Sequence, residues 1–482
     1  MKNYPQKMVT YRAAVRGWTA LMVLALAVPV AHGDTRANVD SSVSPDSQTL
    51  AASQYAVTSN RYGDGPPSVF GVDAPELAFI GPSPVGVRTL TVVEPAQPDL
   101  LAIDAVTGKV PKHDRKLMVD LWYPSVPGSS KPPESYSGSL PAEPPAPPAT
   151  FTVRGIAIRD ARPAGRDYPL VVVSHGYSNA TAALTWLTEN LASKGYVVAA
   201  IRHDDPAMTD TGKFPQLLLR RPLDIAFVTR TLRERLAAEH LIDPAKVALV
   251  GYSIGGYGVL TSAGATLDPT GPVTKMVPGG LLLPYVRGAR ESGAVTVPSL
   301  KAVVAISPAG GGVLSAWGAE GLKDIHAPLL LIAGDQDRTV NYATGARMIF
   351  SAASNTIRYL LTFKGAGHAI GLNVAPPAMR SRLWDEDWFE DPVWRKERVS
   401  AINAHFITAF LDRYVKGDVG RQAYLDVQTP DADGGVWPQT STLPYSAYSP
   451  SDSTITVWKG FQRNHATGLQ LLKAEAGQAE AP

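Results

Sequence analysis

The feature that most constrains this chain is a series of short, wholly apolar segments separated by longer stretches of helical character. The apolar segments are 169–173, 196–201, 247–250, 302–306, 328–332 and 357–362. A strand that is apolar at every position is typical of a sheet covered by helices on both faces. Helices are expected between these segments, at 182–194 and 222–239. This alternation predicts an α/β fold with a mostly parallel central sheet.

The rest of the chain divides by composition. Residues 34–75 are rich in small polar residues and are expected to form a linker or pro-segment before a main domain at 76–418. That domain is expected to include strands at 88–93 and 117–123, a proline-rich loop at 124–150 and a closing amphipathic helix at 397–414. The irregular segment 261–300 fits either a cap over a site or a surface excursion. Residues 419–482 form a tail, with one added strand expected at 453–458.

The first 33 residues have the layout of a secretory signal. Basic residues at positions 2, 7, 12 and 16 precede the apolar run 18–30, and the small residues Ala31 and Gly33 follow it. The apolar run is short for a bilayer span. Since the 482-residue chain has no cysteine, a lipid-modified cleavage site is excluded. The sequence therefore predicts a protein that is secreted or periplasmic and has no stable membrane span.

Composition also narrows the classes of partner. The formal net charge is +2 and no long run of Lys or Arg occurs, so nucleic acid is not an expected partner. The lack of cysteine excludes disulfides, thiolate catalysis and Cys-ligated zinc. We expect no cofactor and no metal, and the sequence leaves the oligomeric state open.

A Gly-x-Ser-x-Gly motif at 251–255 places Ser253 between an apolar strand and a glycine-rich helix start. Such a motif is weak evidence by itself, because about 0.25 chance matches are expected in a chain of this length and composition. Its position makes it informative. A nucleophile at a sharp strand-to-helix turn needs small neighbours on both sides, and Gly251 and Gly255 meet that need. Ser253 is therefore the predicted nucleophile.

A serine hydroxyl needs a base, and in this arrangement the acid and the histidine follow the serine along the chain. His368 lies on a glycine-bearing loop after the last apolar strand, whereas His405 lies within the expected closing helix and His465 in the tail. His368 is therefore the predicted base. Asp335 and Asp337 both follow the strand at 328–332, and either carboxylate could orient the imidazole.

Stabilising an oxyanion requires two aimed N–H donors. The backbone N–H of Ile254, directly after the nucleophile, is one candidate. The backbone N–H of Tyr177 is the other, because it lies on the loop after the strand 169–173, where Gly176 permits a close approach. His175, on the same loop, is expected to be structural.

Taken together, these segments resemble the α/β-hydrolases, in particular the branch of platelet-activating factor acetylhydrolases and dienelactone hydrolases. The resemblance covers roughly 169–417 and is carried by the segments 174–178, 193–204, 221–225, 251–256, 334–340 and 367–368. It implies an α/β-hydrolase fold, with Asp337 as the acid and Asp335 as a turn residue. Dienelactone hydrolase uses a cysteine nucleophile, whereas this chain has none.

The implied function is a serine hydrolase that cleaves carboxylic esters through an acyl-serine, acting on a small-molecule or lipid ester. A phospholipase A2-like enzyme of the platelet-activating factor acetylhydrolase type and a polyester hydrolase are close alternatives, and an exopeptidase is a more remote one. The alternative of another class is an inactive scaffold that binds a lipid or a partner.

Three other polar segments are expected to be structural. His203, Asp204 and Asp205 are interpreted as a solvated loop rather than a metal cluster. Asp224 is expected near the start of the helix 222–239, where a carboxylate suits the helix dipole. The aromatic and acidic segment 384–391 is interpreted as a packed loop rather than the lining of a site entrance.

Overall fold

The computed structural model describes residues 65–104, 107–140, 147–208, 210–436 and 455–478. The expected signal segment 1–33 and most of the expected linker 34–75 lie outside the described residues. Residues 65–75 are described, and they pack onto the main domain rather than standing apart from it. For example, the buried hydroxyl of Ser68 donates a hydrogen bond to Glu189 at 2.8 Å.

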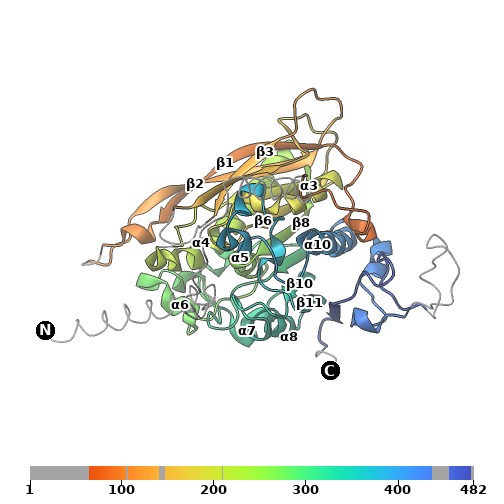
Figure 1. The fold of residues 1–482 in the computed structure, drawn as a ribbon. Helices are drawn as coiled ribbons and strands as arrows, with labels where there is room; N and C mark the ends of the chain where they lie inside the picture. The colour runs from red at the N-terminus through yellow and green to blue at the C-terminus, as the bar shows by residue number, and fades with distance from the viewer. Residues whose placement is uncertain (1–64, 105–106, 141–146, 209, 437–454, 479–482) are drawn as a thin grey trace, which may run out of the picture.

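A ten-stranded sheet forms the centre of the molecule (Figure 1). Its strands, in spatial order, are β12 (Leu469–Ala474), β11 (Arg358–Phe363), β10 (Leu329–Gly334), β9 (Ala302–Ile306), β8 (Ile242–Tyr252), β6 (Tyr168–Ser174), β7 (Val197–Arg202), β2 (Lys112–Pro124), β1 (Val85–Pro98) and β5 (Ile158–Arg159). The six strands from β11 to β7 run parallel. Strands β2 and β12 are antiparallel to their neighbours β7 and β11. The predicted mostly parallel sheet is confirmed.

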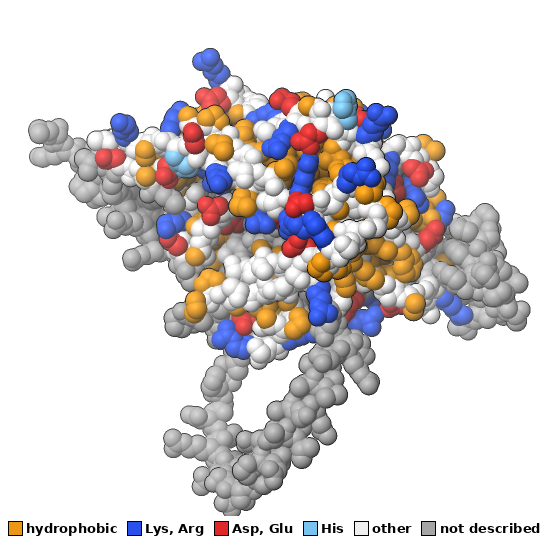
Figure 2. Space-filling model, turned by 90° about the horizontal axis from the view of Figure 1, so that it is seen from above, with side chains coloured by type: hydrophobic (Ala, Val, Ile, Leu, Met, Phe, Trp, Pro, Cys, Tyr) orange, Lys and Arg blue, Asp and Glu red, His pale blue; other side chains and the backbone are white. Residues whose placement is uncertain are grey.

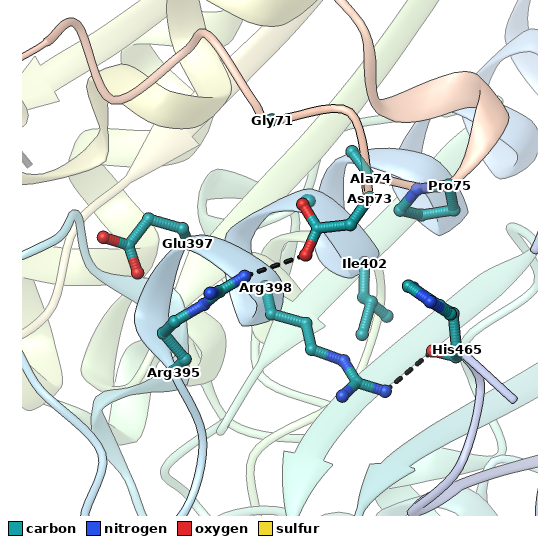
Figure 3. A pocket seen from close by; sticks show the side chains of 10 residues that line it. Gly71, Asp73, Ala74, Pro75, Arg395, Glu397, Arg398, Ile402 and His465 are labelled. Carbon is teal, nitrogen blue, oxygen red and sulfur yellow. Dashed lines mark hydrogen bonds and ion pairs between the residues drawn. The ribbon is translucent and has the colours of Figure 1, made fainter. Parts of the chain in front are cut away.

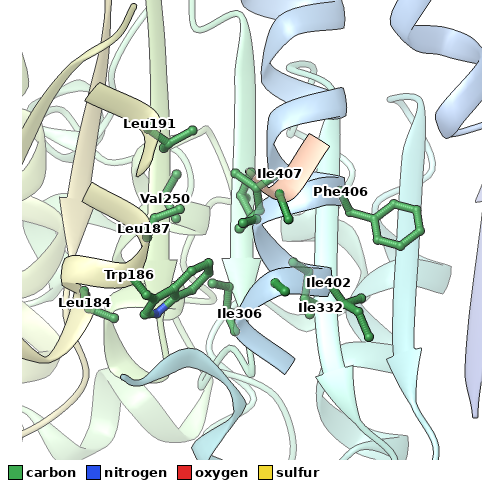
Figure 4. Packing of buried hydrophobic residues seen from close by; sticks show 14 of the residues in the cluster. Leu184, Trp186, Leu187, Leu191, Val250, Ile306, Ile332, Ile402, Phe406 and Ile407 are labelled. Atoms are coloured by element: carbon green, nitrogen blue, oxygen red, sulfur yellow. The ribbon is translucent and has the colours of Figure 1, made fainter. Parts of the chain in front are cut away.

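Helices cover both faces of this sheet. One face packs against α3 (Thr185–Ser193) and α10 (Lys396–Leu411), and the other against α4 (Pro215–Ala238), α5 (Ile254–Ser262) and α8 (Met348–Ala352). Successive strand residues face opposite sides, so both faces must be apolar. In β8, for instance, Val250 joins the first core and Leu249 the second. Figure 4 shows Trp186 and Leu187 of the α3 side and Ile402 of α10 packing over Val250, Ile306 and Ile332.

Helix α4 differs from the sequence expectation. It begins at Pro215, so Pro222, the expected first residue, lies inside the helix. A proline has no N–H to donate to the carbonyl four residues earlier. That carbonyl, on Leu218, accepts a hydrogen bond from the hydroxyl of Tyr257 on α5 at 2.8 Å. The tertiary contact satisfies the freed carbonyl, and it is invisible to a local rule for helix starts.

In two regions the strands differ from the sequence expectation. The expected loop 124–150 includes β3 (Ser135–Leu140), which pairs with β4 (Ala149–Arg154) as an antiparallel hairpin. In the tail, residues 455–458 of the expected strand 453–458 form no strand, and 453–454 lie outside the described residues. The tail's strand is β12, because the buried residues Leu469 and Leu471 lie on one face of a segment that pairs with the free edge of β11.

The insertion 261–300 packs beside α4 and α5. It contains α6 (Pro272–Met276), and its anchors include Val297 N to Ser262 O at 2.8 Å and Arg230 to the carbonyl of Ala294 at 3.1 Å. Ser262 is the last residue of α5, whereas Ser253 precedes its first. These contacts place the insertion at the far end of α5 from Ser253, which favours a surface excursion over a cap.

The outer surface carries charges of both signs. Figure 2 shows basic and acidic side chains interspersed with apolar ones over one face rather than gathered into a single-sign field. Within the described ranges, no helix combines the length and hydropathy that a membrane crossing requires.

Candidate active site

Ser253 occupies the sharp turn between β8 and α5. Its backbone has φ 55° and ψ −120°, a conformation that is costly for a residue with a side chain. The turn is held because its N–H donates to the carbonyl of Ile306 on β9 at 2.9 Å. Only glycine fits on either side. A Cβ on Gly251 would lie 2.3 Å from the carbonyl oxygen of Gly255, and one on Gly255 would lie 2.1 Å from that of Ser174.

His368 and Asp337 reach Ser253 from the ends of the neighbouring strands β11 and β10. His368 Nε2 lies 3.0 Å from Ser253 Oγ, and His368 Nδ1 lies 2.7 Å from Asp337 Oδ2. A carboxylate only accepts hydrogen bonds, so Nδ1 carries the proton and Nε2 is left to accept from the serine hydroxyl. The side chain of His368 is 19% exposed and that of Asp337 is 1% exposed. The aspartate is therefore buried, whereas solvent reaches the histidine.

Asp337 is stabilised as a carboxylate. Burial alone would raise its pKa, but the adjacent His368 and the backbone N–H groups of Val340 and Thr339 lower it. Those two amides donate to Oδ1 at 3.1 and 2.9 Å, which leaves Oδ2 for the imidazole. Asp335 has a different contact, because its Oδ1 accepts from the N–H of Gly365 at 2.7 Å. Asp335 therefore links the loop after β10 to the loop after β11.

The other downstream histidines lie elsewhere. His405 is buried in α10, where Nδ1 accepts from the N–H of Leu77 at 3.1 Å. His326, which the sequence reasoning did not weigh, precedes β10 and is therefore at the opposite end of the sheet from Ser253. His465 lines a small surface hollow with Asp73, Arg395 and Arg398 (Figure 3). No candidate catalytic residue lines that hollow.

The candidate oxyanion donors come from two adjacent strands. Ser174 at the end of β6 pairs with Gly251 near the end of β8, so the loop with Tyr177 and the turn at Ser253 leave the sheet side by side. This is the point where the order of strands reverses, since β7 follows β6 on one side and β8 lies on the other. Ile254 is the first residue of α5, where an N–H has no partner within the helix. Among the described residues, none accepts a hydrogen bond from the Tyr177 amide.

Several supporting residues were missed by sequence reasoning. Tyr252 packs its ring 5.3 Å from that of His368 and donates to the His368 carbonyl at 3.2 Å. Asp391 accepts from the N–H of Gly367, the residue before His368, at 2.7 Å. The buried Lys396 donates to the carbonyl of Ala369, just after it, and burial lowers the pKa of Lys396 to about 7. No local pattern marks Asp391 or Lys396, because their partners are fixed only when α10 packs on the sheet.

A second serine–histidine–aspartate arrangement lies beneath the Tyr177 loop. His203 Nε2 lies 2.9 Å from Ser174 Oγ, and His203 Nδ1 lies 3.0 Å from Asp224 Oδ2. Arg115 holds Asp224 with two hydrogen bonds of 2.7 and 2.8 Å. The expectation of a solvated loop agrees with the exposed Asp204 but is wrong for His203, and the expectation for Asp224 is wrong as well. His203 is buried rather than solvated, and Asp224 lies within α4 rather than near its start, because α4 begins seven residues before the expected position at Pro222.

The expected packed loop 384–391 overlaps α9 (Leu383–Asp387) and includes the buried side chains of Asp385 and Phe389. Within the described ranges, no group of three or more His, Asp and Glu side chains is placed to hold a metal ion.

The sheet order, the strained serine turn and the helices on both faces define the α/β-hydrolase fold, as predicted. A family model described as "PETase: PET hydrolase-like" matches residues 157–272. That segment includes Ser253, Ile254 and Tyr177 and ends before Asp337 and His368.

Curated relatives are distant. Cutinase 1 of Thermobifida cellulosilytica is 25% identical over 203 residues, which cover 42% of this chain and 60% of the relative. Cutinase est2 of Thermobifida alba is 23% identical, over 42% of this chain and 53% of the relative. The matched region thus spans less than two thirds of these relatives. Among solved structures, a ferulic acid esterase from Streptomyces cinnamoneus matches 69% of this chain and 91% of its own, with 22% identity and a TM-score of 0.43. Which branch of the α/β-hydrolases the chain resembles most stays a prediction.

Proposed function

We propose that this protein is a serine hydrolase that cleaves carboxylic esters through an acyl intermediate on Ser253. The observation that carries the proposal is the hydrogen-bonded series Ser253–His368–Asp337, mounted on a strained turn at the start of α5. The matches to a PET hydrolase-like family model and to cutinases support the same conclusion.

The chemistry follows from the geometry. His368 Nε2 takes the proton of Ser253 Oγ as the oxygen attacks the ester carbonyl, and Asp337 stabilises the imidazolium that forms. The amides of Tyr177 and Ile254 donate to the oxyanion. His368 then returns the proton to the leaving alcohol. In the second half, His368 activates a water that releases the acid from Ser253.

Two features bear on the substrate and on the location of the protein. The family match and the cutinase relatives favour a polyester among the substrates, with a phospholipase A2-like activity as the alternative. The basic, apolar and small-residue order of 1–33 supports export to the periplasm or the medium.

The test is a panel of p-nitrophenyl esters of increasing acyl length, together with a polyester film and a short-chain phospholipid. The wild type should release p-nitrophenol, and Ser253→Ala should abolish the release. Ser262→Ala is the matched control, because Ser262 lies at the far end of the same helix and makes one 3.3 Å hydrogen bond to Pro222 O. Full activity of Ser253→Ala would overturn the proposal.

A fluorophosphonate probe addresses the rival, an inactive binding scaffold. Labelling of the wild type at Ser253, mapped by mass spectrometry, indicates an activated nucleophile. A folded wild type that neither labels nor cleaves any ester of the panel is the result expected of a scaffold.

A further inference from the structure

Arg221 on α4 is a fully buried cation whose donors converge on the loop that carries Tyr177. Its Nη1 donates to the carbonyl of His175 at 2.6 Å and to Ser174 Oγ at 3.2 Å. Its Nη2 donates to the carbonyl of Gly176 at 3.2 Å and pairs with Asp205. The side chain of Arg221 is 0% exposed and that of Asp205 is 6% exposed. One guanidinium thus holds two consecutive carbonyls.

The second of these carbonyls determines where the Tyr177 amide points. In a trans peptide the C=O of one residue and the N–H of the next point in opposite directions. The Gly176 oxygen is directed at Arg221 inside the fold, so the Tyr177 N–H is directed away from Arg221. Flipping this peptide would turn the donor inward and leave a carbonyl at the candidate oxyanion position.

His175 adds a second hydrogen bond to the same oxygen. Its Nδ1 lies 2.7 Å from the Gly176 oxygen, which can only accept, so Nδ1 carries the proton. Its Nε2 accordingly accepts from the N–H of His203, at 3.4 Å. Burial, followed by the nearby charge of Arg221, lowers the pKa of His175 well below its usual value, which keeps this tautomer neutral.

The loop is also held after Tyr177. Ser178 has φ 51°, and its N–H donates to Asp205 Oδ2 at 3.1 Å, the same oxygen that pairs with Arg221. The Gly176 carbonyl and the Ser178 amide on either side of this peptide are therefore linked to Arg221, directly or through Asp205. The Gly176 oxygen also accepts from the N–H of Asn179 at 3.4 Å. On its other side Arg221 donates to Ser174, whose hydroxyl is hydrogen-bonded to His203, and His203 is hydrogen-bonded in turn to Asp224.

We infer that Arg221 is a positioning residue for ester hydrolysis, which fixes the Gly176–Tyr177 peptide so that the Tyr177 N–H faces the oxyanion. The inference rests on the proposed function and goes beyond it, because Arg221 touches neither substrate nor Ser253. Its effect is specific to the transition state, since the oxyanion exists only after Ser253 has attacked.

The experiment compares Arg221→Lys and Arg221→Gln with the wild type on one p-nitrophenyl ester. Lysine keeps the charge but loses the planar fork that spans two carbonyls. We expect kcat to fall about 10- to 100-fold in both, somewhat less than the loss on deleting an oxyanion donor, with KM within about threefold. The Ki of a trifluoromethyl ketone, which forms a tetrahedral adduct on the serine, should rise by the factor that kcat/KM falls. The pH midpoint of kcat should not move, because His368 is not a partner of Arg221.

Arg220→Gln is the matched control. Arg220 is also a buried arginine of α4, but it donates to Gln97 and the carbonyl of Pro98 rather than to the Tyr177 loop. It should lose stability and keep kcat per folded molecule. Because Arg221→Gln leaves Asp205 unpaired, the double variant Arg221→Gln/Asp205→Asn removes that carboxylate and provides a folded form for the same measurement.

Wild-type kcat in any folded Arg221 variant would overturn the inference, as would a loss confined to KM with an unchanged Ki for the ketone. Neither result touches the proposed function, which fails only if the wild type does not cleave esters or if Ser253→Ala retains activity.

Discussion

The molecule contains two serine–histidine–aspartate arrangements with nearly the same distances and different surroundings. Between serine and histidine the distances are 3.0 Å at Ser253 and 2.9 Å at Ser174, and between histidine and aspartate 2.7 and 3.0 Å. His368 is 19% exposed, whereas His203 is 1% exposed. In the buried set, Arg115 donates to Asp224 and Arg221 donates to Ser174.

The comparison indicates that hydrogen-bonding distances alone do not distinguish a candidate catalytic site from a buried structural network. Ser253 lies on a strained turn at a helix start, next to a histidine that solvent can reach. Ser174 ends a buried strand, and its hydroxyl is already held by His203 and Arg221. We propose that the first arrangement is catalytic and that the second supports the Tyr177 loop.

Exchanging each histidine for glutamine tests this assignment most strongly. We expect His368→Gln to lower kcat on a p-nitrophenyl ester by about 10⁴- to 10⁶-fold, because the serine loses its base. His203→Gln should stay within about tenfold of the wild type per folded molecule. Initial rates, normalised to folded protein by circular dichroism, make the comparison. Similar losses in both variants would contradict the division of roles.

The two aspartates that follow β10 provide the next test. Asp337→Asn should reduce kcat by about 10³- to 10⁴-fold, because an amide cannot both hold the Nδ1–H tautomer and stabilise an imidazolium. Asp335→Asn keeps an oxygen that can accept from Gly365 and should change kcat by no more than about threefold. A larger loss from Asp335→Asn than from Asp337→Asn would reverse the assignment of the acid.

Substitutions in the buried arrangement should cost more stability than substitutions in the Ser253 arrangement, the opposite of the order expected for kcat. Asp224→Asn leaves Arg115 buried beside an uncharged partner, so we expect the free energy of unfolding to drop by about 3–5 kcal/mol. Asp337→Asn has no buried arginine to leave unpaired and should drop it by less than about 2 kcal/mol. Urea unfolding followed by tryptophan fluorescence measures both values, and equal losses would count against the contrast.

The last prediction is a dependence of stability on pH. Burial, followed by the nearby charge of Arg221, lowers the pKa of His203 from 6.5 to about 4. The unfolded chain then binds a proton between these values and the folded chain does not, so stability is lost as the pH falls from about 6.5 to 4. The slope from this group approaches about 1.4 kcal/mol per pH unit.

Since the buried His175 and His405 also have lowered pKa values and act in the same direction, the His203 contribution is the difference between wild type and His203→Gln. That difference should shrink as the pH falls through this window. A difference that stays constant would mean that His203 is not buried as a neutral ring.

Much of this arrangement was determined by the sequence alone. Wholly apolar strand segments encode a covered parallel sheet, because burial on both faces leaves no position for a polar residue. The Ser253 turn was predictable from Gly251 and Gly255, since a close backbone approach excludes any Cβ there. The location of His368 after the last apolar strand was enough to bring it to the same edge of the sheet as Ser253.

Tertiary structure decided the rest, because it depends on groups that are distant in sequence. Asp335 and Asp337 differ by two positions, and only packing against the β11 loop brings one to Gly365 and the other to His368. Helix α4 continues through Pro222, and the hydroxyl of Tyr257 satisfies the carbonyl that this proline leaves free. His203, Asp224 and Arg221 carry no local sign of burial, since each depends on partners from other strands and helices. A sequence pattern records which faces are covered, and the folded chain alone determines which polar groups meet.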